Sequence, residues 1–328
     1  MLIVSQSMKN SEEAPSPLST PLPLGEKRVW IAGGRGFIGS RLCRALKREG
    51  LPGRSGLGAQ LKLFEGDISD RKTVQQSVLD SQPDYIVNLA APVSVRRDPK
   101  LQEKMDRIIV GGLRNILAAM EELPTNPLLL QCGTCEEYGS IPAPFCEESE
   151  PGLPVSPYAR AKLEATRIAL NSGVRVVVAR PFLTYGPNQR GEGLVPSAIR
   201  AALTGADFKM TSGTHTREFN YVDDIAQDLA DLLLCPSAEG QIVNLGSGEE
   251  HRVVDVARKA WALAGGDKNR LLIGGRPERP ADIPRLFADV SRSRELLGGR
   301  PRLSLEDGLR ATIAGFEATL SREEPNES

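Results

Sequence analysis

A glycine-rich turn near the N-terminus connects a short apolar segment to a helical pattern. Residues 28–32 predict a buried strand, and residues 37–49 predict a helix. The turn between them reads Gly33-Gly34-Arg35-Gly36-Phe37-Ile38-Gly39, which contains both Gly-x-x-Gly-x-x-Gly and Gly-x-Gly-x-x-Gly. Glycines at these spacings let backbone N–H groups and a helix N-terminus approach a pyrophosphate closely. The sequence therefore predicts a dinucleotide-binding site here; the alternative is a glycine turn without a ligand.

Strands and helices alternate along the first half of the chain. Further strands are expected at residues 61–64, 85–89, 128–132 and 174–179, with helices at 70–80 and in a long stretch ending at Met120. This alternation is typical of βαβ units, in which helices cover both faces of a parallel sheet. We therefore predict an α/β fold, a Rossmann-type doubly wound parallel sheet with a smaller C-terminal substrate-binding region.

Three regions are expected along the chain. Residues 1–26 contain four prolines and five serines but no long hydrophobic stretch of the kind that a secretory signal needs. We expect a disordered N-terminal extension there, with Met8 as an alternative start. Residues 27–180 should form the dinucleotide-binding core. Residues 181–328 should be mainly a substrate-binding region that contributes a strand near 241–245 to the core.

The composition excludes several classes of protein. No apolar run reaches the roughly 18–20 residues needed to cross a bilayer, so a membrane protein is excluded. Lys and Arg number 41 against 42 Asp and Glu, and aromatic residues make up 5%, which argues against a nucleic-acid partner. Five cysteines argue against a disulfide framework and for a reducing, cytoplasmic compartment. With only His215 and His251, a triad hydrolase or a His-rich metal site has too few residues to form.

An acidic residue usually follows the glycine turn by about 20 residues and binds the ribose hydroxyls. Residues 50–58 contain no acid and no clear strand. Either one strand of the sheet is missing, or the loop reaches the ribose in another way. Arg54 and Ser55 would suit a 2′-phosphate and so favour NADP, which leaves the choice between NAD and NADP open.

Nine short motifs occur in one order along the chain. They are the glycine turn; Gly66-Asp67-Ile68; Asn88-Leu89-Ala90-Ala91; Thr134-Cys135-Glu136-Glu137-Tyr138-Gly139; Tyr158-Ala159-Arg160-Ala161-Lys162; Arg180-Pro181-Phe182 with Tyr185-Gly186-Pro187; Arg217-Glu218-Phe219 with Tyr221-Val222-Asp223-Asp224; Asn244-Leu245-Gly246-Ser247-Gly248; and Arg279-Pro280-Ala281-Asp282. In this order, from Lys27 to about Phe316, the chain resembles the extended short-chain dehydrogenase/reductase family, the nucleotide-sugar epimerases and dehydratases.

The resemblance implies an NAD cofactor, with NADP not excluded, a nucleotide-diphosphate sugar as substrate, and a homodimer. The residues that it assigns to cofactor binding are Gly33, Gly36, Phe37, Ile38, Gly39, Asp67, Ile68, Leu89, Ala90, Ala91, Tyr158 and Lys162. It assigns Arg217 and Arg279 to the diphosphate of the substrate, because guanidinium groups pair well with phosphate oxygens. As ordinary surface arginines, the two would need no such role.

Tyr158 and Lys162 are four residues apart, so on a helix both point into one site. A neighbouring ammonium should lower the phenol pKa from its usual value of about 10 and make Tyr158 a proton acceptor near neutral pH. Thr134 ends a strand and can hydrogen-bond the same substrate hydroxyl. The resemblance implies that these three catalytic residues oxidise a sugar alcohol to a ketone. On its own, the Tyr–Lys pair would also suit an ordinary exposed helix.

Cys135 and Glu136 follow Thr134, where sugar 4,6-dehydratases have Asp and Glu and epimerases have small or apolar residues. By this resemblance Glu136 removes the C5 proton and Cys135 is the general acid for the C6 hydroxyl. A thiol with a pKa of about 8.5 is still protonated at neutral pH. The same run is similar to that of UDP-N-acetylglucosamine 5,6-dehydratases. Alternatively, Cys135 only packs and Glu136 is structural; Cys132-x-x-Cys135 lacks the partners for a zinc or redox site.

Three positions depart from the family pattern: Asn88 replaces a common His, Ile108 a helix Asn, and Leu183 a substrate-binding Asn. The last change suggests an unusual sugar or nucleotide. The leading interpretation is an NAD(P)-dependent nucleotide-sugar dehydratase. The alternatives are a 4-epimerase or 4-ketoreductase, with Glu136 as a bystander, and a cofactor-binding scaffold or sensor that has lost catalysis.

Overall fold

Six parallel strands form the central sheet of the computed structural model, which describes residues 24–47, 50–52, 55–92, 96–191, 193–278 and 283–323. In sheet order they are β10 (Ile242–Leu245), β5 (Val176–Pro181), β4 (Leu128–Cys132), β3 (Tyr85–Asn88), β1 (Arg28–Ala32) and β2 (Gln60–Phe64). The chain places β2 on one side of β1 and β3 on the other, so the strand order reverses at β1. In open parallel sheets, ligands bind at the carboxyl ends of the strands near such a reversal. The predicted α/β sheet is confirmed.

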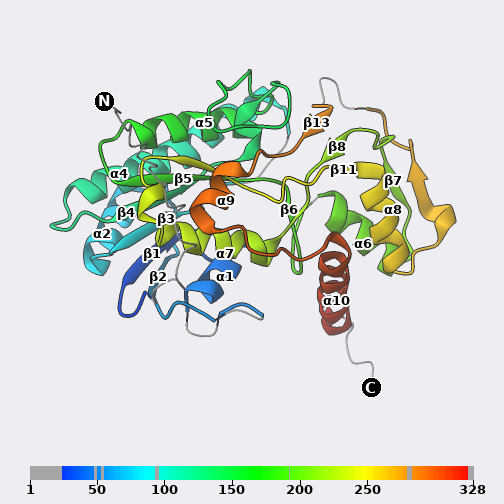
Figure 1. Ribbon diagram of the computed structural model, residues 1–328, viewed down its shortest axis with the longest axis horizontal. Coiled ribbons are helices and arrows are strands. Elements are labelled where there is room, and N and C mark those ends of the chain that lie inside the picture. The colour runs from blue at the N-terminus through cyan, green and yellow to red at the C-terminus, as the bar shows by residue number, and fades with distance from the viewer. Residues whose placement is uncertain are drawn as a thin grey trace, which may run out of the picture.

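Helices cover both faces of the sheet (Figure 1). One face packs against α2 (Arg71–Ser81), α4 (Gly112–Glu121) and α5 (Pro157–Leu170), and the other against α1 (Phe37–Leu46) and α7 (Val222–Leu233). Side chains of β1 alternate between the two apolar clusters, because successive residues of a strand point to opposite faces. The second half of the chain therefore contributes more than the expected strand to the core: β10, α7 and α9 (Ser291–Leu297) all pack there.

The rest of the second half forms its own apolar cluster beside the sheet (Figure 1). Its helices are α6 (Leu194–Leu203), α8 (Val253–Leu263) and α10 (Leu305–Glu323). Its short strands are β6 (Thr184–Tyr185) with β9 (Asn220–Tyr221), β7 (Phe208–Met210) with β12 (Leu271–Ile273), and β8 (Thr216–Arg217) between β11 (His251–Arg252) and β13 (Arg285–Leu286). This cluster packs around Tyr185 and Trp261, apart from the two clusters that flank the sheet.

The long helical stretch expected through Met120 is present, but its geometry changes along its length. A 3-10 helix (Pro99–Leu101) leads into α3 (Gln102–Met105), a π-helix (Asp106–Gly111) and then α4. The β-branched run Ile108-Ile109-Val110 and the two glycines that follow it are weak α-helix formers, which explains a departure at this point. The helix predicted at 37–49 also ends early, at Leu46, because the backbone of Lys47 is extended.

The connection between α1 and β2 contains no strand among its described residues, 47, 50–52 and 55–59. It folds back on the end of α1, where Leu57 N donates to Ala45 O and Ala59 N to Leu46 O. β2 then pairs directly with β1, from Arg28 opposite Gln60 to Ala32 opposite Phe64. Of the two alternatives left open by the sequence, the structure favours a missing strand.

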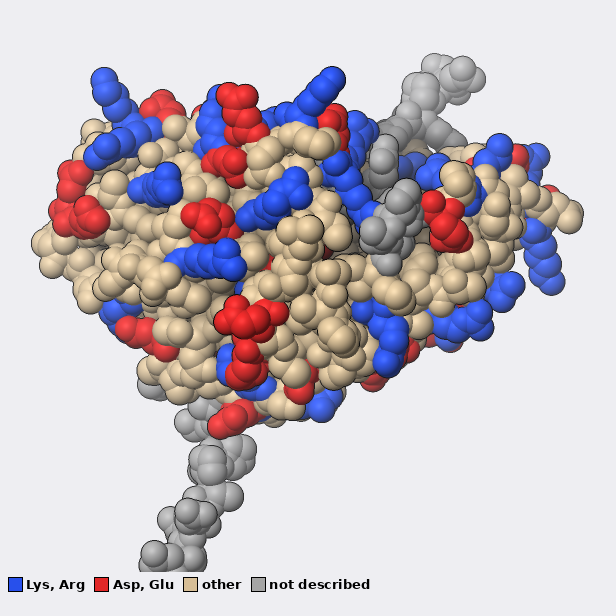
Figure 2. All heavy atoms as spheres, turned by 90° about the horizontal axis from the view of Figure 1, so that it is seen from above, with Lys and Arg blue, Asp and Glu red and all other residues tan. Residues whose placement is uncertain are grey.

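Residues 1–23 of the predicted extension lie outside the described residues. Leu24, which we also placed in the extension, is buried in the cluster that contains α1 and α7, so the packed chain begins before Lys27. No helix of the described residues is both long and apolar enough to cross a membrane. Lys and Arg side chains are intermixed with Asp and Glu over the face shown in Figure 2.

Candidate functional site

The glycine turn lies at the carboxyl end of β1, where the strand order reverses. Gly33 has a φ of +79°, and a Cβ there would lie 2.8 Å from Leu89 C and 2.9 Å from Ala90 N. A Cβ on Gly39 would overlap the carbonyl oxygen of Gly33. Gly36 is the N-cap of α1, with no side-chain hydrogen bond to the first turn of the helix. Such a close-fitting backbone cradle at a helix N-terminus fits the pyrophosphate of a dinucleotide.

An acidic residue does stand beside this turn, but sequence reasoning missed it. Glu65 directly follows β2 and forms an ion pair with Arg35 of the turn, and both side chains are exposed. Because β2 pairs with β1, the end of β2 lies where the ribose-binding acid is usually found. Because the described residues between α1 and β2 contain no strand, this acid comes later in the sequence than the expected interval of about 20 residues after the glycine turn. Ser55 is exposed, and Arg54 lies outside the described residues.

Two further predicted cofactor segments also follow strands of the sheet. Asp67 Oδ1 accepts hydrogen bonds from the backbone N–H and the hydroxyl of Ser69, which hold the pKa of Asp67 below its usual range. Ile68 is held by α4: Asn115 Nδ2 donates to Ile68 O at 3.0 Å, and a Cβ on Gly112 would lie 2.8 Å from the Ile68 side chain.

The segment Leu89–Ala91 follows β3. Leu89 N donates to Ala32 O at 3.0 Å, which ties this segment to the end of β1. Asn88, which replaces a common His, is buried; its amide donates to Gln131 Oε1 at 2.9 Å and its oxygen accepts from Ala90 N at 3.2 Å. The amide therefore fixes the segment that meets Gly33.

Thr134, Tyr158 and Lys162 are all buried at the carboxyl end of β4. Thr134 is the N-cap of a short 3-10 helix (Cys135–Tyr138), and Tyr158 and Lys162 lie on α5. Lys162 Nζ donates to Cys132 O at 2.6 Å and lies 5.9 Å from the centroid of the Tyr158 ring. The structure thus brings the predicted Tyr–Lys pair and Thr134 into one region.

The predicted lowering of the Tyr158 pKa is wrong for this structure. Burial raises the pKa of the phenol well above its usual value, and the negative charges of Glu136 and Glu137 add to the shift. Desolvation penalises the charged phenolate, and it is the largest cause of the shift. The ammonium is also engaged by the carbonyl oxygen of Cys132.

Glu136 and Cys135 differ sharply in their surroundings. Glu136 is half-buried, and its Oε2 accepts a hydrogen bond from Ser156 Oγ at 3.1 Å. Cys135 is 3% exposed, and burial, followed by the charge of Glu136, raises the pKa of its thiol. The Cys135 thiol therefore keeps its proton at neutral pH and is a weak acid. Cys132 and Cys135 are free thiols, and the described residues contain no cluster of three His, Cys, Asp or Glu side chains suited to a metal.

Glu137 is a buried residue that organises this region, and the sequence analysis assigned it no role. Its carboxylate accepts from Thr134 N at 2.8 Å, from Thr166 Oγ1 at 2.9 Å and from Arg180 Nε at 2.9 Å. Thr134-x-x-Glu137 is a capping box, so the sequence pattern carried a signal for this contact.

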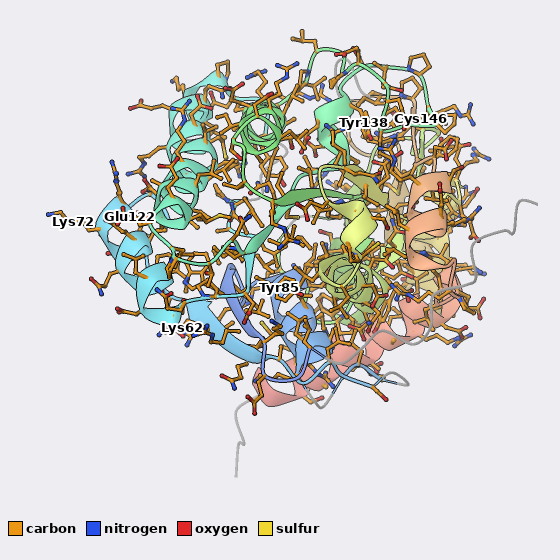
Figure 3. All side chains as sticks on the ribbon, turned by 60° about the vertical axis from the view of Figure 1, so that its left-hand side comes forward. Lys62, Lys72, Tyr85, Glu122, Tyr138 and Cys146 are labelled. Carbon is orange, nitrogen blue, oxygen red and sulfur yellow. The ribbon has the colours of Figure 1, made fainter. Side chains whose placement is uncertain are left out.

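Tyr138 anchors the far end of the same 3-10 helix. Its ring centroid lies 5.1 Å from that of Phe145, and its hydroxyl donates to Asn244 Oδ1 at 2.7 Å. Figure 3 shows Tyr138 near Cys146, the neighbour of Phe145 in sequence.

Arg217 is buried on β8, where its Nη1 donates to Thr216 O and to Ile283 O, both at 2.7 Å. Its charge lowers the pKa of the Cys135 thiol slightly, so the guanidinium lies within electrostatic reach of the 3-10 helix. The next residue, Glu218, is fully buried and accepts from Ala288 N at 2.8 Å. Arg279 lies outside the described residues.

The other two departures are apolar positions. Ile108 is half-buried against the cluster that contains α2, α4 and α5. Leu183 packs between the clusters around Tyr185 and around Phe145. Neither side chain offers a hydrogen bond to a substrate.

Comparison with known proteins identifies a matching family, related proteins and similar solved structures. Residues 29–246 match the model of the NAD dependent epimerase/dehydratase family. A dTDP-glucose 4,6-dehydratase of Streptomyces niveus is 28% identical over 92% of this chain and 96% of that protein. A UDP-N-acetyl-alpha-D-glucosaminuronate decarboxylase of Bacillus cytotoxicus is 28% identical over 89% of this chain and 98% of its own. Among solved structures, DesIV, a dTDP-glucose 4,6-dehydratase of Streptomyces venezuelae with NAD bound, superposes with a TM-score of 0.78 at 25% identity, over 91% of this chain and 99% of that chain.

Proposed function

The chain belongs to the NAD dependent epimerase/dehydratase family, and from this premise we propose that it is a nucleotide-sugar dehydratase, a lyase. The proposed reaction oxidises C4 of the sugar transiently, removes the C5 proton and releases the C6 hydroxyl as water. The observation that carries this proposal is the carboxylate of Glu136. It lies on the 3-10 helix that Thr134 caps and is hydrogen-bonded to Ser156, two residues before Tyr158. A base is needed there for the C5 proton, and a 4-epimerase has no use for one.

We propose that the dinucleotide is held by the glycine turn and by the segments Asp67–Ile68 and Leu89–Ala91. When bound, it supplies hydride transfer at its nicotinamide. The close fit of Gly33 against Leu89 and Ala90 supports this assignment, because any side chain at Gly33 would separate the two segments. Lys162, at the carboxyl end of β4, supplies a positive charge beside Tyr158.

In the proposed first step, the phenolate form of Tyr158 accepts the proton of the C4 hydroxyl while hydride leaves C4, and Thr134 Oγ1 orients that hydroxyl. In the second, Glu136 accepts the C5 proton, which the C4 ketone has made acidic. Cys135 then gives its thiol proton to the departing C6 hydroxyl, which leaves as water. Hydride then returns to the sugar, so the dinucleotide would end in its oxidised form. With return to C4, Tyr158 gives its proton back to O4, and with return to C6, Glu136 gives its proton back to C5. The proton that remains on the other of these two residues replaces the one lost by Cys135.

Mass spectrometry of a panel of UDP- and dTDP-sugars incubated with the protein tests the proposal. A product lighter by one water identifies a dehydratase. An altered sugar of unchanged mass identifies the alternative, a 4-epimerase. A 4-ketoreductase would instead act on a keto-sugar when reduced cofactor is supplied, and its product would be two hydrogens heavier. One observation favours that alternative: the buried Cys135 thiol, whose pKa is raised, is a weaker acid than the Asp of 4,6-dehydratases.

We also propose that Glu65 selects NAD. A carboxylate at the end of β2 would accept hydrogen bonds from the ribose hydroxyls and repel a 2′-phosphate, which Arg35 would attract. Glu65→Ser should weaken NAD binding and strengthen NADP binding, which changes the ratio of the two dissociation constants about 10- to 100-fold. Calorimetric titration with each dinucleotide measures this ratio. Arg35→Ala is the paired control and should weaken NADP more than NAD; tighter binding of NADP by the unmodified protein would contradict the assignment.

Arg217 is proposed to bind the substrate diphosphate. Arg217→Ala should raise KM about 10- to 100-fold with a smaller effect on kcat, because it removes charge-assisted hydrogen bonds worth about 1.5–3 kcal/mol. Arg252→Ala is a matched control: Arg252 is opposite Thr216 in β11, so its side chain lies on the other face of the small sheet. Steady-state kinetics on folded variants measures KM and kcat. Equal KM values for the two variants would show that Arg217 does not bind the substrate diphosphate. The same role for Arg279 stays a prediction.

The homodimer and the cytoplasmic location stay proposals. The five free cysteines support a reducing compartment.

A further inference from the structure

Ser156 makes two hydrogen bonds with one hydroxyl. Its Oγ accepts from Ala159 N at 3.0 Å, which caps the N-terminus of α5, and it donates to Glu136 Oε2 at 3.1 Å. The residue is only 1% exposed, so water does not compete easily for either bond.

The second bond exceeds what a helix cap requires. An N-cap side chain needs only an oxygen that accepts a backbone N–H, and Asp or Asn would serve as well as Ser. A serine hydroxyl also has a single hydrogen to donate. With its acceptor used by Ala159, that hydrogen goes to Glu136, which lies 20 residues earlier on a different element.

Glu136 is thereby tied to both parts of the oxidation site. Its backbone N–H donates to Thr134 Oγ1 at 3.4 Å, and its side chain is held by the residue that begins the helix of Tyr158. A displacement of α5 would thus move Tyr158 and the Glu136 carboxylate together.

We propose that Ser156 is a positioning residue for Glu136, fixing the carboxylate in the orientation and the ionised state that removal of the C5 proton requires. This inference rests on the proposed dehydratase function. A hydrogen bond donated to a carboxylate favours its charged form. Its loss should therefore slow elimination and move the acid limb of the pH profile for C5 exchange to higher pH, while C4 oxidation is much less affected.

Three variants separate positioning from capping. Ser156→Thr keeps both the donor and the acceptor and should behave like the unmodified protein. Ser156→Gly removes the hydroxyl, while glycine remains a good N-cap residue; it should keep most of its melting temperature and lose about 10-fold or more in C5 exchange. Ser156→Ala loses both and should be less stable as well as slower in exchange.

The measurements are deuterium exchange into C5 across the pH range and single-turnover formation of reduced nicotinamide, both with sugar nucleotide. We expect Ser156→Gly to lose exchange with the shifted acid limb and to keep most of the oxidation rate. An unchanged exchange rate and pH profile in Ser156→Gly would overturn the inference, as would an equal loss in both steps. Glu136→Gln is measured in parallel: if that variant still exchanges C5, the proposed function itself has failed, whatever Ser156 does.

Discussion

Glu136→Gln should abolish elimination while leaving C4 oxidation in place. The amide keeps the shape and the hydrogen-bond acceptor of the carboxylate but cannot take the C5 proton. Loss of a general base typically costs about 10²- to 10⁴-fold in rate. Reduced nicotinamide should therefore build up when sugar nucleotide is added. Its absorbance should not decay afterwards, because no product is formed. Stopped-flow absorbance measures this directly.

Deuterium exchange provides the complementary test of Glu136. In D₂O the unmodified protein should exchange deuterium into C5, and the Gln variant should not. Glu150→Gln, an exposed acid on the loop that precedes α5, is the matched control and should change neither signal. Full-mass product with no C5 deuterium from the unmodified protein would end the dehydratase proposal and favour the 4-epimerase or 4-ketoreductase.

Tyr158→Phe should abolish both steps, because every path begins with loss of the C4 hydroxyl proton. The expected loss is again about 10²- to 10⁴-fold, with folding and dinucleotide binding nearly intact, since only one oxygen is removed. Steady-state turnover and a dinucleotide titration on the same sample measure the two effects. The control is Tyr85→Phe. Tyr85 lies at the amino end of β3 (Figure 3), so it is at the opposite end of the parallel strands from the proposed site.

The raised pKa of Tyr158 adds a signature in pH. A base acts in its deprotonated form, so C4 oxidation should accelerate as pH rises from neutral toward alkaline values, until the phenol is ionised. The Phe variant should lack this dependence. Near-normal turnover by Tyr158→Phe would show that another group accepts the proton.

Local patterns in the sequence were sufficient for the sheet and for grouping Thr134, Tyr158 and Lys162 in one region, while the catalytic roles of these residues stay predictions. Strand β4 and the start of α1 were predicted to the residue, because an apolar run ending in small or polar residues is a strong local signal. The π-helical segment inside the long helix before Met120 was not predicted, since weak helix formers leave the outcome to packing against α5.

Properties that depend on neighbours distant in sequence were harder to predict. The sequence argument predicted the pKa shift of Tyr158 in the wrong direction, because burial and the carboxylates of the 3-10 helix raise this pKa. Glu65 was missed, because the absent strand changes which acid stands beside β1. The bond from Ser156 to Glu136 joins two elements, and no sequence spacing announces it.

The short sheet has a consequence for association between copies of the chain. With the second strand absent, β2 is the last strand of the sheet, and no further strand pairs with it in the described part of the chain. The outermost strand of a sheet exposes backbone groups that can template pairing with another molecule. Lys62 lies in the middle of β2, between Leu61 and Leu63, and its side chain is exposed (Figure 3). A charge there opposes edge-to-edge aggregation, so this lysine protects the outermost strand of the sheet.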